Sequence, residues 1–156
     1  MRTEQQCVRE FMQKNAFTVD EKLGASSAPP IDGELAEAAG QMMKIAMVLK
    51  DAAVAFPGDH RVVRAFLMAE ELAETIAAMA TDDEVELADG LADLTYVVLG
   101  TAVKFSIPLH AVFHEVHRSN MTKTRGRSDD FLKAGKGMTY EPPDVRRAID
   151  DGRASP

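Results

Sequence analysis

Carboxylates at helical spacing occur in two neighbouring stretches: Glu70, Glu71 and Glu74 in the first, and Glu86, Asp89 and Asp93 in the second. At about 100° per residue, the members of each set share one face of a helix. The first set lies along an otherwise apolar stripe, and residues 65–103 contain nine carboxylates but no Lys or Arg. Unpaired negative charge beside apolar side chains is costly to desolvate, so the pattern predicts a bound cation.

The ligand types indicate which cation is expected. Hard carboxylate oxygens without His or Cys suit Mg²⁺ or Mn²⁺ rather than Zn²⁺. The polar break at 81–83 is short, which favours two antiparallel helices whose acidic faces meet. The sequence therefore predicts a divalent-metal site between two helices. A pair of solvated acidic faces without a metal is the alternative.

Composition favours one all-α domain. The 156 residues are 46% hydrophobic but only 6% aromatic, and Ala, Leu and Met dominate the apolar set, which favours helices over strands. One domain over residues 1–156 is expected. The formal net charge of −7 argues against a general nucleic-acid or membrane-surface binder, because either would normally present a basic face. Small ligands or proteins are the expected partners.

Apolar periodicity and helix-ending residues divide this domain into three parts. Residues 1–32 are predicted to form an N-terminal helix and a Pro-rich strap, residues 33–123 a helical bundle, and residues 124–156 a basic loop with a short helix. Within the bundle, a third helix begins near His60 behind an Asp59 cap, a fourth covers 83–105, and a fifth follows Pro108. The apolar repeat of 33–56 is too long for one small domain to cover, which predicts a homo-oligomer.

Two features bear on the expected location of the protein. Cys7 is the single cysteine, so no intramolecular disulfide is expected. The first residues lack the apolar core of a signal peptide, and no apolar run reaches the length of a membrane span. A cytoplasmic protein is the simplest expectation.

The charge changes sign after the second acidic stretch. Residues 104–136 contain seven Lys or Arg and three histidines against three acids. An acidic seam followed by a basic segment suits an anion bound through a divalent metal, such as a nucleotide polyphosphate. The histidines at 110, 114 and 117 are irregularly placed beside the acids, and we interpret them as structural.

Three segments together carry a family resemblance: EELAE (70–74), ELADGLADLTYVVLGTA (86–102) and AVFHEVHRSNMTK (111–123). They closely resemble the all-α nucleoside triphosphate pyrophosphohydrolases. This MazG-like superfamily includes dimeric dUTPases, dCTPases and the phosphoribosyl-ATP pyrophosphohydrolase of histidine synthesis. The resemblance implies a MazG-like helical bundle of about five helices, assembled as a homodimer or homotetramer.

The resemblance also implies a site. Glu71 and Glu74 would supply Mg²⁺ ligands from one helix and Asp93 from the next, with Mn²⁺ as an alternative ion and Glu70 near the attacking water. The chain departs from the usual ExxD motif, since Gly90 stands three residues before Asp93.

Two residues offer an oxygen in place of the missing glutamate. Asp89 lies on the same face, one residue before Gly90, and we assign it as the fourth ligand; Glu86 is the alternative, one turn further back. On this interpretation, Glu introduced at position 90 is expected to replace part of the function of Asp89.

Substrate contacts are implied on later segments. The resemblance makes Asn120 and Lys123 contacts for the nucleotide and its phosphates. Arg118 is a further phosphate candidate, and Lys136 resembles a phosphate-contacting lysine of the family's C-terminal loop. Tyr96, one turn past Asp93, is a candidate for the base pocket or for the ordinary core.

The expected activity is Mg²⁺-dependent cleavage of a nucleoside triphosphate between the α and β phosphates. The products would be the monophosphate and pyrophosphate, and the motif pattern is nearest the branch that acts on dUTP or dCTP. Hydrolysis of phosphoribosyl-ATP is the competing enzymatic interpretation. A helical interaction module without a divalent ion is the non-enzymatic one. No motif encodes the base or sugar preference.

Overall fold

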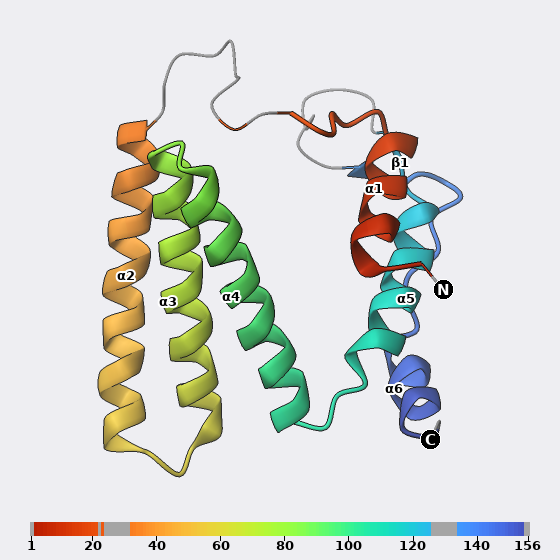
Figure 1. Ribbon diagram of the computed structural model, residues 1–156. Helices are drawn as coiled ribbons and strands as arrows, with labels where there is room; N and C mark the ends of the chain where they lie inside the picture. The colour runs from red at the N-terminus through yellow and green to blue at the C-terminus, as the bar shows by residue number, and fades with distance from the viewer. Residues whose placement is uncertain (1, 22, 24–31, 126–133, 155–156) are drawn as a thin grey trace. The chain divides into compact units, whose positions relative to one another are not determined.

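The computed structural model describes residues 2–21, 23, 32–125 and 134–154. Within these ranges are six helices and one pair of very short strands (Figure 1). The helices are α1 (Glu4–Lys14), α2 (Asp32–Ala55), α3 (His60–Ala80), α4 (Glu84–Lys104), α5 (Leu109–Met121) and α6 (Val145–Ala154). β1 (Thr124–Arg125) pairs antiparallel with β2 (Ala134–Gly135). The predicted all-α class is confirmed. Most of the predicted strap lies outside the described residues, as do residues 126–133 of the basic segment.

The packing divides the chain into two compact units. One comprises Lys22–Phe105, and the other combines Met1–Glu21 with Ser106–Pro156. α5 packs with α1 and α6, and the predicted bundle at 33–123 stays a prediction. The expectation of one domain over the whole chain stays a prediction. Taken singly, none of the described helices is long and apolar enough to cross a membrane; only α4 and α5 counted together reach that length and composition.

Three helices build the first unit, with α3 packed against both α2 and α4 (Figure 1). The buried apolar side chains here are small, and include Ala39, Ala46, Ala73 and Ala78. Small side chains let helix backbones approach closely. As predicted, α3 begins at His60, and the Asp59 carboxylate accepts a hydrogen bond from the Arg61 N–H at 3.0 Å.

The turn between α3 and α4 is built from three polar residues. Thr81 ends α3, and Asp82 adopts a φ of 52°, a left-handed conformation that Asp tolerates better than most residues. Asp83 then caps α4 by accepting hydrogen bonds from the N–H groups of Val85 and Glu86 at 3.0 and 3.1 Å. This short connection makes the two helices antiparallel neighbours, which brings their acidic faces together.

A half-buried arginine joins the same two helices at the ends remote from this turn. Arg64 on α3 donates to the Val97 carbonyl at 2.6 Å and to the Thr101 hydroxyl at 3.0 Å, both on α4. A Cβ at Gly100 would lie 2.8 Å from the Arg64 guanidinium, so the glycine leaves room for it. The α3–α4 pair is therefore fixed at both ends, with the acidic face between them.

In the second unit, α1 runs parallel to α5. Glu4 pairs with His110 at 2.8 Å, Glu10 approaches His117 at 3.7 Å, and Lys14 donates to the Lys123 carbonyl at 3.2 Å. Lys14 also donates to the Met121 carbonyl, so a cation lies at the C-terminus of α5, where the helix dipole favours it. Cys7 is buried on α1 between these contacts. The N-terminal helix is thereby docked along α5.

Candidate metal and substrate site

A cavity of about 330 Å³ lies between the acidic faces of α3 and α4. Its described lining residues are Glu74, Ala77, Ala78, Thr81, Glu86, Asp89, Gly90 and Asp93. Four of these are carboxylates, one from α3 and three from α4. All four are solvent-exposed residues, so the cavity is open to a ligand from solution.

The other two predicted acids, Glu70 and Glu71, are half-buried on α3 and do not line the cavity. Burial raises the pKa of the Glu71 carboxyl above 4.5, and the negative charges of Glu74, Asp93, Glu70 and Asp89 raise this pKa further. These influences come from both helices. The negative charges of the predicted catalytic acid and of the other three predicted metal ligands therefore all act on Glu71.

The raised pKa of Glu71 makes the stability of the folded state depend on pH in a definite direction. The protonated carboxyl is favoured in the folded state, so this contribution to stability is present below pH 4.5 and is lost as the pH rises through the raised pKa. At neutral pH the cluster is therefore repulsive. No Lys or Arg is among the described residues that line the cavity. A divalent cation that accepts hard oxygen ligands fits this charge and this donor set.

Gly90 allows α3 and α4 to approach each other at the cavity. It is buried, and an added Cβ would lie 3.0 Å from the Thr75 hydroxyl and 3.2 Å from the Thr75 Cα. Thr75 is itself buried and donates a hydrogen bond to the Glu71 carbonyl at 2.8 Å. A glutamate at position 90 would need the two helices to move apart by a few tenths of an ångström. This packing favours a residue without a side chain at position 90.

The same packing changes the expectation for a glutamate introduced at position 90. We expect Asp89→Ala to weaken Mg²⁺ binding nearly as much as Asp93→Ala, and Glu86→Ala to have a milder effect, measured by calorimetric titration. Adding Gly90→Glu to Asp89→Ala should restore little, because the new Cβ separates the helices that hold the remaining ligands. Full affinity in Asp89→Ala together with lost affinity in Glu86→Ala would instead assign the ligand to Glu86.

A second cavity, of about 360 Å³, lies between α2 and α3. Its described lining residues are Ala36, Ala39, Gly40, Met43, Ala73, Glu74, Ala77, Ala80 and Thr81. It shares Glu74, Ala77 and Thr81 with the acidic cavity, so the two cavities flank the same part of α3. Sequence reasoning missed it. The signal that was present is the series of small residues at helical spacing on the facing sides of α2 and α3.

The remaining predicted site residues are not among the described residues that line the two cavities. Tyr96 on α4 is 78% exposed and is not among the described residues lining either cavity. Arg118, Asn120, Lys123 and Lys136 belong to the other compact unit. There the ammonium group of Lys136 lies 5.0 Å from the centre of the Tyr140 ring. These assignments stay predictions.

Arg118 has several partners within its own unit. Its guanidinium donates to both carboxylate oxygens of Glu115 at 2.9 Å, to Glu141 at 2.7 Å and to the Pro142 carbonyl at 3.2 Å. The Glu115 carboxylate also accepts the Asp144 N–H at 2.8 Å, just before α6. We call these groups the Glu115 clamp. A phosphate would have to compete with two carboxylates for Arg118.

Comparison with known proteins places the acidic cavity in a family context. Residues 53–120 match the family described as phosphoribosyl-ATP pyrophosphohydrolase. The matched segment contains all of α3 and α4, most of α5, the four carboxylates of the acidic cavity, and Glu70 and Glu71. None of the curated proteins and none of the solved structures gives a significant match to the chain. The family match confirms the resemblance seen in the sequence: residues 53–120 are similar to a pyrophosphohydrolase family within the MazG-like all-α superfamily.

Proposed function

We propose that the protein is an Mg²⁺-dependent nucleoside triphosphate pyrophosphohydrolase, which releases pyrophosphate and leaves the nucleoside monophosphate. One observation carries the proposal: the carboxylates of α3 and α4 gather at one cavity, inside the segment that matches a pyrophosphohydrolase family. The alternative, an acidic surface that is merely solvated, does not explain why Glu71 is half-buried and raised in pKa by the charges of four other carboxylates.

The residues of the cavity suit the chemistry of phosphoanhydride cleavage. Glu71 and Glu74 from α3, with Asp89 and Asp93 from α4, would hold Mg²⁺. A bound Mg²⁺ would supply positive charge that neutralises the phosphates and activates a water. The role of Glu70 would be to orient or deprotonate the attacking water.

In this proposal the cavity between α2 and α3 binds the base or the sugar of the nucleotide. It is lined mainly by alanines, Gly40 and Met43, and its position beside Glu74 puts an apolar surface next to the proposed metal site. Ligand cavities of a few hundred cubic ångströms commonly combine such apolar walls with few polar groups. The nucleotide would thus extend across α3, with its phosphates on the α4 side.

Phosphoribosyl-ATP is the second candidate substrate, because the matched family is named for it. Its phosphoribosyl group carries an additional anionic phosphate, which needs cationic or N–H donors. None of the described residues that line the α2–α3 cavity is Lys or Arg. This lining favours an unsubstituted base, as in dUTP or dCTP.

The test is a substrate screen that measures pyrophosphate release in the presence of Mg²⁺. It should include the common NTPs and dNTPs, dUTP, phosphoribosyl-ATP, and a parallel series with Mn²⁺. We expect pyrophosphate and a monophosphate from at least one triphosphate, with no turnover after chelation of the metal. Release of orthophosphate instead would place the cleaved bond elsewhere. Absence of turnover with every substrate would favour the helical interaction module.

We also expect a homodimer or a dimer of dimers. Several large apolar side chains on α2, directly after it and on α4 are 65% to 81% exposed: Val48, Val54, Phe56, Tyr96 and Val103. Apolar surface of this kind is commonly covered by a partner, and a second copy supplies a self-complementary one. Sedimentation at micromolar concentration should show the oligomer, and Val54→Glu should weaken it. A monomeric wild-type protein would contradict the prediction.

A further inference from the structure

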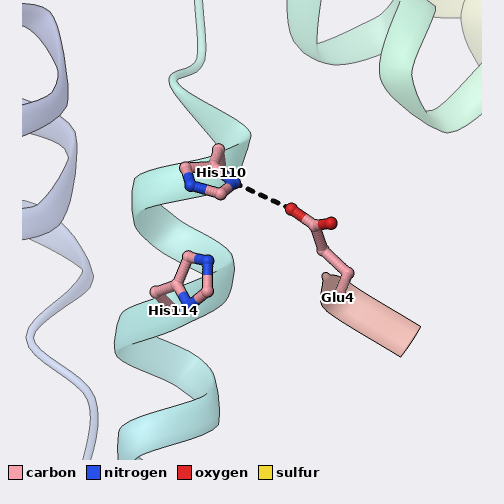
Figure 2. A group of neighbouring side chains, drawn as sticks. All are labelled: Glu4, His110 and His114. Carbon is pink, nitrogen blue, oxygen red and sulfur yellow. Dashed lines mark hydrogen bonds and ion pairs between the residues drawn. The ribbon is translucent and has the colours of Figure 1, made fainter. Parts of the chain in front are cut away.

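Three side chains of the second unit form a group that the proposed function does not use. His110 and His114 stand one helical turn apart on α5, and Glu4 faces them from the first turn of α1 (Figure 2). One potential ligand atom from each of the three residues lies within 4.8 Å of the other two. The closest pair joins His110 Nδ1 to a Glu4 oxygen at 2.8 Å. Two helices thus present imidazole and carboxylate donors to one small space.

His114 provides an independent observation. Its Nε2 is buried and has no hydrogen-bond partner among the described residues. Buried polar atoms are nearly always satisfied, so an unpaired imidazole nitrogen requires an explanation. The rings of His110 and His114 meet edge to face, with centroids 4.4 Å apart, and Figure 2 shows a ring nitrogen of His114 directed toward the space beside His110 and Glu4. A bound ion there would supply the missing partner.

The donor set selects a different ion from that of the acidic cavity. Two neutral imidazoles and one carboxylate suit Zn²⁺, whereas Mg²⁺ prefers oxygen ligands alone. Tetrahedral bonds of about 2.1 Å place ligand atoms about 3.4 Å apart, so the widest separation must shorten by up to about 1.4 Å and the Glu4–His110 pair must widen by about 0.6 Å. The side chains of Glu4 and His110 are about half exposed and are free to make this adjustment.

We propose that Glu4, His110 and His114 form a second metal site, which binds Zn²⁺ or a related transition ion and joins α1 to α5. Three protein ligands leave a fourth position for water. Because Glu4 lies on a separate helix from the histidines, ion binding holds α1 along α5. The site is independent of the proposed hydrolytic activity and lies entirely within the second unit.

The proposal is tested by titrating the full chain with Zn²⁺ in the presence of millimolar Mg²⁺, which occupies the acidic cavity. We expect one tightly bound equivalent and an increase in Tm. Glu4→Gln, His110→Ala and His114→Ala should each weaken Zn²⁺ binding by at least about tenfold, because each removes one of three ligands. His117→Ala is the matched control and should bind as wild type. Co²⁺ absorption provides a second readout of tetrahedral coordination.

Several outcomes would overturn the proposal. Wild-type affinity in Glu4→Gln or in His114→Ala would show that these side chains are not ligands. Loss of Zn²⁺ binding in Asp93→Asn would place the ion in the acidic cavity, and loss in Cys7→Ser with retention in Glu4→Gln would assign it to the thiol. Glu4 is half exposed, so Glu4→Gln is expected to keep its fold and to give a clear result, with circular dichroism as the check.

Discussion

Asp93→Asn and Glu74→Gln are each expected to reduce pyrophosphate release by at least about 100-fold, because each removes an anionic metal ligand from the cavity. Folding should survive both changes. In metal-free buffer at neutral pH, each variant should have a Tm equal to or higher than that of wild type, since one of the charges that raise the pKa of Glu71 is gone. Steady-state kinetics and thermal melts measure the two effects.

A control for these variants lies on the same helix. Glu84 is exposed in the first turn of α4 and is not among the described lining residues, so Glu84→Gln changes the net charge equally without entering the cavity. Its activity should remain near wild type. If Asp93→Asn or Glu74→Gln retained activity within a few-fold of wild type, the metal-site assignment would be wrong.

The largest effect on stability is expected at the Glu115 clamp. Arg118 and the Asp144 N–H lower the pKa of Glu115 from 4.5 to about 2. A carboxyl with a depressed pKa stabilises the folded state above its unfolded pKa, and this stabilisation is lost as the pH falls through the folded pKa. The contribution of Glu115 should therefore be complete above pH 4.5 and should disappear between pH 4.5 and about 2.

Glu115→Gln tests this assignment. The variant should have a clearly lower Tm at pH 7, because the neutral amide leaves Arg118 without its bidentate partner on α5. The difference from wild type should shrink as the pH is lowered toward 2. Glu141→Gln is the matched control, since Glu141 also pairs with Arg118 but has a side chain 69% exposed, and its effect should be smaller. A difference that does not vary with pH would contradict the prediction.

The features that could be predicted from the sequence are local. Asp59 and Asp83 cap helices where their side chains reach N–H groups two or three residues later. The acidic faces of α3 and α4 follow from helical periodicity, and the short turn between the helices favours adjacent antiparallel neighbours. Both inferences need only the geometry of neighbouring residues, so one sequence suffices for them.

The features that were missed depend on contacts between distant segments. Nothing in the spacing of the histidines indicates Glu4, which pairs with His110 across 106 residues of chain. The docking of α5 with α1 and α6 is likewise a choice between apolar faces that look alike in sequence. Gly90 stands at a position where the family resemblance implies a metal ligand, and the Thr75 backbone that favours a glycine there lies on the preceding helix.

The close approach of Gly90 and Thr75 bears on the size of the ion that the proposed site accepts. Mg²⁺ forms bonds of about 2.0–2.1 Å and tolerates little distortion, whereas Ca²⁺ accepts bonds of about 2.3–2.6 Å in looser arrangements. Ligands from two helices can close around the smaller ion only if the helix axes are near each other. The hydrogen atom that Gly90 carries in place of a side chain sets that separation. In the proposed Mg²⁺ site, discrimination between the two ions would thus depend on a residue that has no ligand atom, and Gly90→Ala should shift the preference toward Ca²⁺.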